Sequence, residues 1–480
     1  MEQFKKTILL GTFWSFIGQF GYVLVVLLSN VFFSRLLTPF EYGQMGIAMF
    51  FIIIFNVLVE AGLSGALIRK KEAKPEDYST ILIFNIGISL FLFLLVFTFS
   101  DFIADFYNNK QLKYIILFSS FVVVFNAFQI AHIIKLTRDF KFKEKATYQL
   151  ISIIIASVIG VTAAYFGFGI WSMIVTQILN SVIFNLILWK SDTIFQKLVF
   201  SKESFKDLMG FGINTTISSL INTSFENIYQ LVLGKYFSVI QVGFFYQAKR
   251  LADMPYAMTM ITASGPLYSS ISKVKDDKEL FNKTFLNIFK IINIILAFIC
   301  FISFVYADGI MLFLYGEKWL EAGFYMKILS FSTLFISGEG VNQLVFKVYN
   351  KTDFILRAMI FKNSIQLVTI VLGVYFLNLN ILVFGFLLSV FLSSFVYYYY
   401  SRKLIGRINR LEIVNFFKIL FIIATLFLIH KIVLKWFEFG LVFDFLMIPF
   451  ELLFYITSIQ LLRIFDIKGE LYKILESKQN

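Results

Sequence analysis

Long apolar stretches recur from one end of the 480-residue chain to the other. Most are about 20 residues or longer, which is the length that a helix needs to cross a bilayer. Apolar residues make up 59% of the chain, charged residues make up 15%, and the mean hydropathy is +0.80. So few polar side chains cannot cover a soluble surface. Cys300 is the single cysteine, so no disulfide scaffold is possible. The sequence predicts an all-α polytopic membrane protein.

Charge clusters and turn-forming residues divide the chain into about fourteen predicted spans. They lie near residues 8–34, 42–67, 78–100, 112–134, 146–166, 168–189, 207–233, 241–267, 284–306, 320–346, 355–377, 380–400, 413–433 and 443–463. Two tight hairpins are expected, at Gly167–Gly169 and at Asn378–Asn380. The first run is too long for a signal peptide and lacks a cleavage site, so we interpret it as an uncleaved transmembrane helix.

Lysine and arginine are distributed unequally between the two sides that these spans define. If the N-terminus is cytoplasmic, 30 of the 43 lysine and arginine residues fall in cytoplasmic segments and 7 fall in outer loops. Cytoplasmic loops of membrane proteins carry such an excess. We therefore expect both termini in the cytoplasm. The same excess accounts for the net charge of +13 without a nucleic-acid partner.

The sequence partly repeats at an offset of 200 residues. Residues 30–48 align with residues 230–248, and Gly43 falls on Gly243. Spans 1–6 and spans 7–12 both begin on the inside, as in parallel repeats of transporters. We expect three parts, namely an N-terminal lobe at 1–200, a C-terminal lobe at 201–408, and two additional helices with a cytoplasmic tail at 409–480. Two such lobes around a central cavity would work by alternating access.

Charged residues lie deep in the predicted span 241–267. Lys249 and Arg250 are about 8–9 residues from its start, or roughly 12–14 Å. Each would cost about 2.5–3.5 kcal/mol against lipid, so both must face protein or a water-filled cavity. Asp253 can pair with either cation on one helix face. A buried salt bridge that only joins two helices is one interpretation, but two cations against one acid favour an anion-binding site.

A polar stripe runs along the predicted span 207–233. Its residues recur every four positions, at Asn214, Ser218, Asn222, Glu226 and Gln230. Hydrogen bonding between helices is one explanation. We favour a hydrated wall that faces a polyhydroxylated substrate, with Gln19 on the corresponding face of the first span.

Two more acids, Glu60 and Glu339, are predicted to be buried in spans. Either could carry a coupling proton or neutralise a nearby cation, and Glu226 has the same two possible roles. No cofactor is expected, and coupling to a proton or sodium gradient is left open. His132 and His430 lie near opposite ends of different spans, so we find no metal-binding spacing and no catalytic triad. The sequence does not predict an enzyme.

Six segments resemble one family in the order in which that family has them. They are Ser34–Ala48 (SRLLTPFEYGQMGIA), Gly65–Arg69 (GALIR), Arg138–Phe142 (RDFKF), Gly167–Gln177 (GFGIWSMIVTQ), Tyr246–Pro255 (YQAKRLADMP) and Tyr315–Trp319 (YGEKW). The chain resembles the Wzx-like bacterial polysaccharide and lipopolysaccharide exporters of the multidrug/oligosaccharidyl-lipid/polysaccharide superfamily. The colanic-acid exporter branch is the most similar.

The resemblance implies twelve core helices in two lobes, with two extra helices. It implies a flippase that moves an undecaprenyl-pyrophosphate-linked oligosaccharide from the cytoplasmic to the outer leaflet of the bacterial plasma membrane, for surface polysaccharide biosynthesis. The family's span-8 motif maps onto Tyr246, Ala248, Arg250 and Leu251. Many members have an acid near Glu226. Lipid-linked oligosaccharide and membrane lipid are the expected partners, and we expect the protein to function as a monomer.

Three other functions stay as alternatives. An ion-coupled drug or small-molecule antiporter of the same superfamily would need an acidic cavity, which the cations of span 241–267 disfavour. A membrane-embedded glycan polymerase or transferase would carry a large outer loop, and the longest here, near 307–319, is short. A structural scaffold would not need buried charges.

Overall fold

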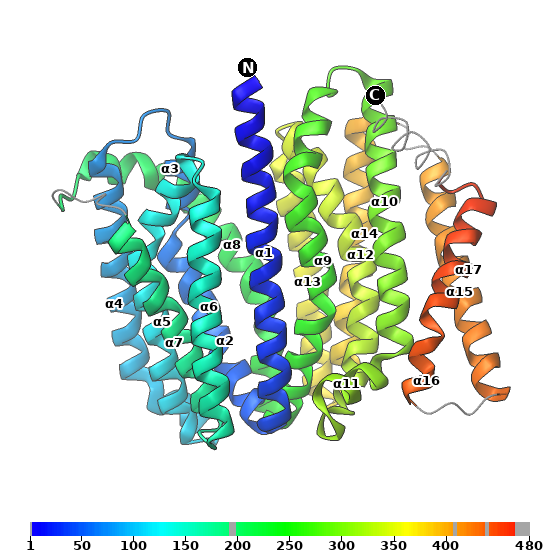
Figure 1. Ribbon diagram of the computed structural model, residues 1–480, viewed down its shortest axis with the longest axis horizontal. Coiled ribbons are helices and arrows are strands. Elements are labelled where there is room, and N and C mark those ends of the chain that lie inside the picture. The colour runs from blue at the N-terminus through cyan, green and yellow to red at the C-terminus, as the bar shows by residue number, and fades with distance from the viewer. Residues whose placement is uncertain (1, 192–197, 407–409, 437–440, 466–480) are drawn as a thin grey trace. The chain divides into compact units, whose positions relative to one another are not determined.

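The computed structural model describes residues 2–191, 198–406, 410–436 and 441–465. Helices make up the regular structure of these residues (Figure 1). They are α1 (Glu2–Leu36), α2 (Pro39–Glu60), α3 (Leu63–Arg69), α4 (Pro75–Phe106), α5 (Gln111–Arg138), α6 (Phe142–Tyr165), α7 (Ile170–Ser191), α8 (Lys202–Tyr236), α9 (Val239–Lys273), α10 (Lys278–Val305), α11 (Ala307–Tyr315), the 3-10 turn η1 (Glu317–Trp319), α12 (Ala322–Val348), α13 (Thr352–Tyr375), α14 (Leu379–Ile405), α15 (Arg410–Trp436), α16 (Leu441–Leu446) and α17 (Ile448–Leu461).

The predicted all-α membrane class is confirmed. Within the described residues, eleven helices are long and apolar enough to cross a membrane. Each of the fourteen predicted spans coincides with a helix or with two consecutive helices. The helices α8, α9 and α12 are not among the eleven. They are the helices that carry the polar stripe, the charged turn and Glu339, respectively. The number of membrane crossings stays a prediction.

Both hairpins form where the sequence places them. Between α6 and α7, Gly167 and Gly169 have φ angles of 85° and 53°, which glycine adopts without steric cost. Between α13 and α14, the Asn378 side chain accepts hydrogen bonds from the backbone N–H groups of Asn380 (2.9 Å) and Ile381 (3.3 Å). Asn378 is thus the N-cap of α14.

The predicted span 42–67 is not one helix. Ala61 and Gly62 have φ angles of 44° and 62°, so α2 ends at Glu60 and the short α3 follows. Glu60 was predicted to be buried because apolar residues flank it on both sides. That prediction is wrong, because the break puts Glu60 at a helix end, where its side chain is exposed.

The first compact unit comprises Met1–Tyr246 together with the short segment Leu314–Lys318. Within it, α2 and the start of α9 approach each other closely at Gly43 and Gly243. A Cβ on Gly43 would overlap the carbonyl oxygen of Val239, and a Cβ on Gly243 would overlap that of Pro39. These two contacts are related by the 200-residue offset of the sequence repeat. Such reciprocity is the signature of a local two-fold axis.

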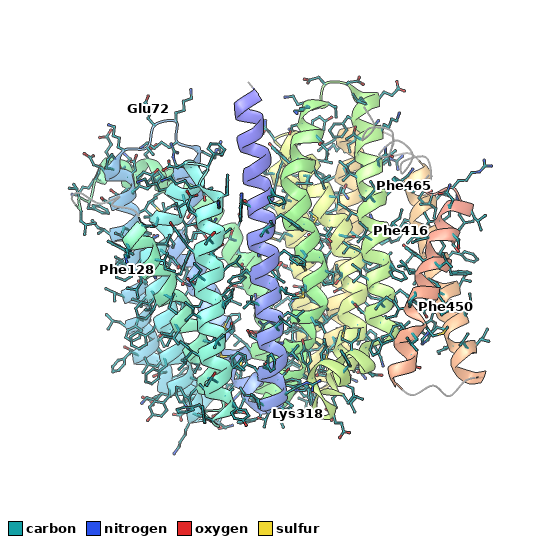
Figure 2. The ribbon with its side chains drawn as sticks, viewed as in Figure 1. Glu72, Phe128, Lys318, Phe416, Phe450 and Phe465 are labelled. Carbon is teal, nitrogen blue, oxygen red and sulfur yellow. The ribbon has the colours of Figure 1, made fainter. Side chains whose placement is uncertain are left out.

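The segment Leu314–Lys318 binds the end of α1 and the turn that follows it. The Arg35 side chain donates to the carbonyl of Leu314 (3.0 Å), and the Asn30 amide donates to the Tyr315 hydroxyl (3.3 Å). The Lys318 ammonium donates to the carbonyls of Arg35 and Leu37. The side chain of Lys318 is labelled in Figure 2. Two segments that carry the family resemblance, Ser34–Ala48 and Tyr315–Trp319, therefore contact each other.

The second compact unit comprises Gln247–Phe313 and Trp319–Asn480. One of its cores lies between α10, α12, α13 and α14, where the rings of Phe346 and Tyr397 stack at 6.0 Å. A second core joins α10 and α12 to α15 and α17, and there Tyr455 stacks on Phe298 at 5.1 Å. The lobe boundaries expected from the repeat stay predictions.

Candidate substrate-binding site

A charged turn in α9 is the centre of the candidate site. The Lys249 ammonium lies 2.6 Å from a carboxylate oxygen of Asp253, one helical turn later. The same ammonium lies 5.4 Å from the centroid of the Phe386 ring of α14. The side chain of Lys249 is 15% exposed and that of Asp253 is 40% exposed, so the pair lies at the edge of the packed interior. Of the two possible partners of Asp253, the structure shows Lys249, while the Arg250 side chain is half-buried.

Small residues hold this turn against α12. Ala248 and Ala252 are buried, and the Thr333 hydroxyl of α12 donates to the carbonyl of Ala252 (3.2 Å). One turn further, Tyr256 packs against Gly340. The face of α9 that packs thus carries positions 248, 252 and 256, and the charged residues lie on the faces beside it.

On α8, the polar stripe is partly exposed. The Asn222 amide donates to a carboxylate oxygen of Glu226 (2.9 Å), and Glu226 is exposed while Gln230 is 2% exposed. A four-residue repeat drifts by about 40° per step around a helix, so the stripe cannot stay on one face. The side chain of Asn214 lies outside the described residues.

The remaining predicted residues lie on other helices. Gln19 is half-buried on α1, and Tyr246 is half-buried and packs against Gly46 of α2. Five predicted site residues belong to the first unit, namely Gln19, Glu60, Asn222, Glu226 and Tyr246, and three belong to the second, namely Lys249, Arg250 and Asp253. The substrate contacts expected of Gln19, Asn222, Tyr246, Lys249 and Arg250 stay predictions. The charge-pairing or ion-coupling roles expected of Glu60, Glu226 and Asp253 also stay predictions.

Sequence reasoning did not identify the partner of Glu339. This carboxylate is 3% exposed on α12, and the Lys362 ammonium of α13 lies 3.4 Å away. The Ser393 hydroxyl of α14 donates to the other carboxylate oxygen. The available signal was Lys362, a lysine inside the apolar predicted span 355–377. Hydropathy alone does not show which acidic residue such a lysine pairs with.

A second buried cluster joins the last helices to α10. The Nδ1 atom of His430 lies 2.8 Å from one oxygen of Glu451, and the Tyr306 hydroxyl donates to the other oxygen (2.9 Å). All three residues are at most 6% exposed. The sequence suggested only that His430 lies near a helix end. In the described part of the chain, no group of three or more His, Cys, Asp or Glu side chains is placed to hold a metal.

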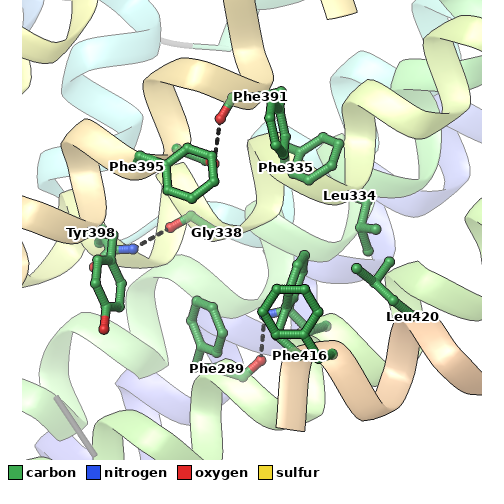
Figure 3. Close-up of a pocket in the computed structure, with 13 residues that line it drawn as sticks. Phe289, Leu334, Phe335, Gly338, Phe391, Phe395, Tyr398, Phe416 and Leu420 are labelled. Carbon is green, nitrogen blue, oxygen red and sulfur yellow. Dashed lines mark hydrogen bonds between the residues drawn. The ribbon is translucent and has the colours of Figure 1, made fainter. Parts of the chain in front are cut away.

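An apolar pocket lies in the second unit between α10, α12, α14 and α15 (Figure 3). Its volume is about 260 Å³. The rings of Phe289, Phe335, Phe391, Phe395 and Phe416 form much of its wall. Among its polar residues, Asn293 and Asn342 donate to backbone carbonyls of their own helices, at 2.7 and 2.8 Å. The pocket therefore suits a hydrocarbon chain rather than a polar group.

Comparison with known proteins decides the family. A profile described as polysaccharide biosynthesis protein matches residues 32–324, more than half of the chain. The chain belongs to this polysaccharide biosynthesis family.

Curated relatives agree with this assignment. The succinoglycan biosynthesis transport protein ExoT of Rhizobium meliloti is 22% identical over 68% of this chain and 66% of its own length. The chain thus spans just under two thirds of that relative. The lipopolysaccharide biosynthesis protein WzxC of Escherichia coli is 23% identical over 83% of this chain and 81% of its own length.

Solved structures show the fold. The lipid II flippase MurJ in an inward closed conformation superposes with a TM-score of 0.75 at 15% identity, covering 93% of this chain and 98% of that one. An inward-facing multidrug resistance transporter of the MATE family, in the MOP superfamily, superposes with a TM-score of 0.62 at 14% identity. The match covers 80% of this chain and 94% of that one. The polysaccharide family member described here therefore has the fold of MOP-superfamily transporters, and the resemblance seen in the sequence is confirmed.

Proposed function

We propose that this protein is a flippase for an undecaprenyl-pyrophosphate-linked oligosaccharide. It moves this substrate from the cytoplasmic to the outer leaflet of the bacterial plasma membrane during surface polysaccharide biosynthesis. The observation that carries the proposal is the charged turn of α9, which places two cations and one acid deep in a helix of a polysaccharide-family membrane protein.

The pyrophosphate is the part of the substrate that is hardest to move through a membrane. Opposite charges attract strongly where the dielectric constant is low, so a cationic site lowers the barrier. Lys249 already binds Asp253 at 2.6 Å and acts as a point charge. Arg250 can bind phosphate oxygens through two parallel hydrogen bonds, so we assign it the main phosphate contact.

Other surfaces suit the rest of the substrate. Polar side chains such as Asn222 and Gln19 can hydrogen-bond to sugar hydroxyls. The aromatic pocket of the second unit offers a place for part of the polyprenyl chain. Each of these features suits one part of such a substrate, namely its charged head, its sugars or its long hydrocarbon tail.

The proposed mechanism is alternating access by two parallel repeat lobes, in a monomer with both termini in the cytoplasm. The offset-200 repeat and the reciprocal contacts of Gly43 and Gly243 support two related halves. The excess of lysine and arginine in the predicted cytoplasmic segments supports the orientation.

Complementation tests the proposed function. The gene is expressed in a cell that lacks its own exporter for the same glycan, and surface glycan and intracellular lipid-linked oligosaccharide are both measured. We expect the surface glycan to return and the intracellular pool to fall. Normal membrane expression with an unchanged pool, together with resistance to cationic drugs, would instead favour the antiporter.

A further inference from the structure

A surface groove lies between α1 and α6 of the first unit, at the end of α1 that is predicted to face outward. Its volume is about 540 Å³, which is within the range of small-molecule pockets. The residues that line it include Phe32, Arg35 and Leu36 of α1 and Val161, Thr162 and Tyr165 of α6. The function proposed above does not use this groove.

The way that α1 packs against α6 changes along the two helices. Near the start of α6, Gly18 lies directly against Ala146, because a Cβ added to Gly18 would overlap the Cβ of Ala146. Towards the other end, large side chains replace the glycines, and Phe32 and Tyr165 are 55% and 77% exposed. The two helices therefore touch closely at one end and leave a groove that is open to lipid at the other.

The groove has apolar walls and one charged residue. Arg35 is exposed, and its Nε–H donates to the carbonyl of Leu314 (3.0 Å), which orients the guanidinium plane. A carbonyl is neutral, so this bond does not cancel the positive charge. A guanidinium has five N–H donors in a fixed fork, so it can hold a carbonyl and a phosphate at once. Tyrosines at the ends of membrane helices lie at headgroup level, and Tyr165 lines the same groove as Arg35.

We propose that this groove binds one anionic phospholipid of the surrounding membrane, with an acyl chain against the apolar wall and the phosphate at Arg35. One arginine matches the single negative charge of phosphatidylglycerol better than the higher charge of a polyprenyl pyrophosphate. Lys318, another cation at this end of α1, donates to the backbone carbonyls of Arg35 and Leu37 and does not line the groove. The inference is independent of which substrate the protein transports.

The test is native mass spectrometry of the purified full-length protein, titrated in detergent with phosphatidylglycerol or with phosphatidylcholine. It gives the Kd of the first bound lipid. The wild type should bind phosphatidylglycerol about tenfold more tightly or better, because the hydrogen bonds of Arg35 to an anion are charge-assisted. Arg35→Gln should lose this preference. The control is Lys113→Gln, because Lys113 is predicted to lie on the same side but pairs with Asp101 (2.7 Å), so this variant should keep the preference.

A second variant fills the groove and leaves Arg35 in place, so the test does not depend on the folding of Arg35→Gln. Thr162→Phe should weaken phosphatidylglycerol binding by about tenfold or more. Its control is Val158→Phe, one turn earlier on α6, because Val158 is 62% exposed but does not line the groove.

Three results would overturn the proposal. The first is equal binding of the two lipids by the wild type. The second is a folded Arg35→Gln or Thr162→Phe that binds phosphatidylglycerol as the wild type does. The third is displacement of bound phosphatidylglycerol by an equal concentration of undecaprenyl phosphate, because the occupant would then be a polyprenyl lipid.

Discussion

Lys249 and Arg250 are neighbours with the same charge, but they occupy different faces of α9, because successive residues are about 100° apart on a helix. Lys249 is held by Asp253 and lies over the ring of Phe386. In the proposed function the two cations have different roles because a guanidinium can bind a phosphate through two parallel hydrogen bonds, whereas an ammonium acts as a point charge.

Arg250→Lys keeps the charge but loses the planar pair of donors. Losing one charge-assisted hydrogen bond costs about 1.5–3 kcal/mol, so we expect export to fall by about tenfold or more at normal protein level. Lys249→Ala should have a smaller effect, because Lys249 already binds Asp253. Surface glycan per unit of membrane protein is the measurement. If Arg250→Lys exports as much glycan as the wild type, the proposed two-hydrogen-bond contact between Arg250 and the phosphate is wrong.

Single residues also show where sequence reasoning succeeds and where it stops. The pairing of Lys249 with Asp253 could be anticipated, because it follows from four-residue spacing on one helix. The pairing of Glu339 with Lys362 could not, because it depends on how α12 packs against α13. Glu60 was misplaced because an apolar run hides a helix break that needs two left-handed residues, Ala61 and Gly62.

At the scale of helices, hydropathy predicts where each helix lies but not which helices approach each other closely. The close approach of α2 and α9 at Gly43 and Gly243 brings backbone against backbone. The repeat predicted that these two glycines are equivalent. It could not predict that they contact each other, because contact depends on tertiary packing.

Gly43→Ala and Gly243→Ala should each destabilise the protein, because the added methyl group meets a backbone carbonyl that cannot move aside. Overpacking of this kind costs about 1–3 kcal/mol or more. Gly87→Ala on α4 is the matched control, because nothing lies within 4 Å of the Cβ that it adds. That control should be neutral or more stable by about 0.5–1 kcal/mol. Thermal melting of the purified variants gives the answer, and a stable Gly43→Ala would contradict the described close approach.

The cluster of Tyr306, His430 and Glu451 fastens α15 and α17 to the end of α10. Breaking a buried pair by removing one partner costs about 3–5 kcal/mol, so Glu451→Ala should lower the stability of the protein markedly. Glu72→Ala, which changes an exposed loop residue, should not. Limited proteolysis is the measurement. If the protease cuts Glu451→Ala and Glu72→Ala at the same rate, the cluster does not hold α15 and α17 to α10.

For the whole molecule, the sequence predicts the membrane class and orientation, because both follow from sums over many residues. The eleven apolar helices confirm the class. The transported glycan cannot be predicted this way, because sugar selection depends on the geometry of a few side chains.

The orientation can be tested with single cysteines. Lys141 should lie in the cytoplasm and Asp105 outside, and both side chains are exposed. Cys300 is the single cysteine of the chain, so a Cys300→Ser background removes all competing labelling. In intact cells, an impermeant thiol reagent should label Asp105→Cys and spare Lys141→Cys. The reverse pattern would invert the assigned orientation.

The central claim is that the protein moves a lipid-linked oligosaccharide and uses Arg250 to do so. The most direct measurement is the rate at which undecaprenyl-pyrophosphate-linked oligosaccharide crosses the bilayer of proteoliposomes, followed by its accessibility to an impermeant sugar-modifying reagent. We predict rapid crossing with the wild-type protein and crossing near the protein-free rate with Arg250→Ala. Two results would contradict the account. One is a normally folded wild-type protein with which the oligosaccharide crosses no faster than in empty liposomes. The other is an Arg250→Ala variant with which it crosses as fast as with an active wild-type protein.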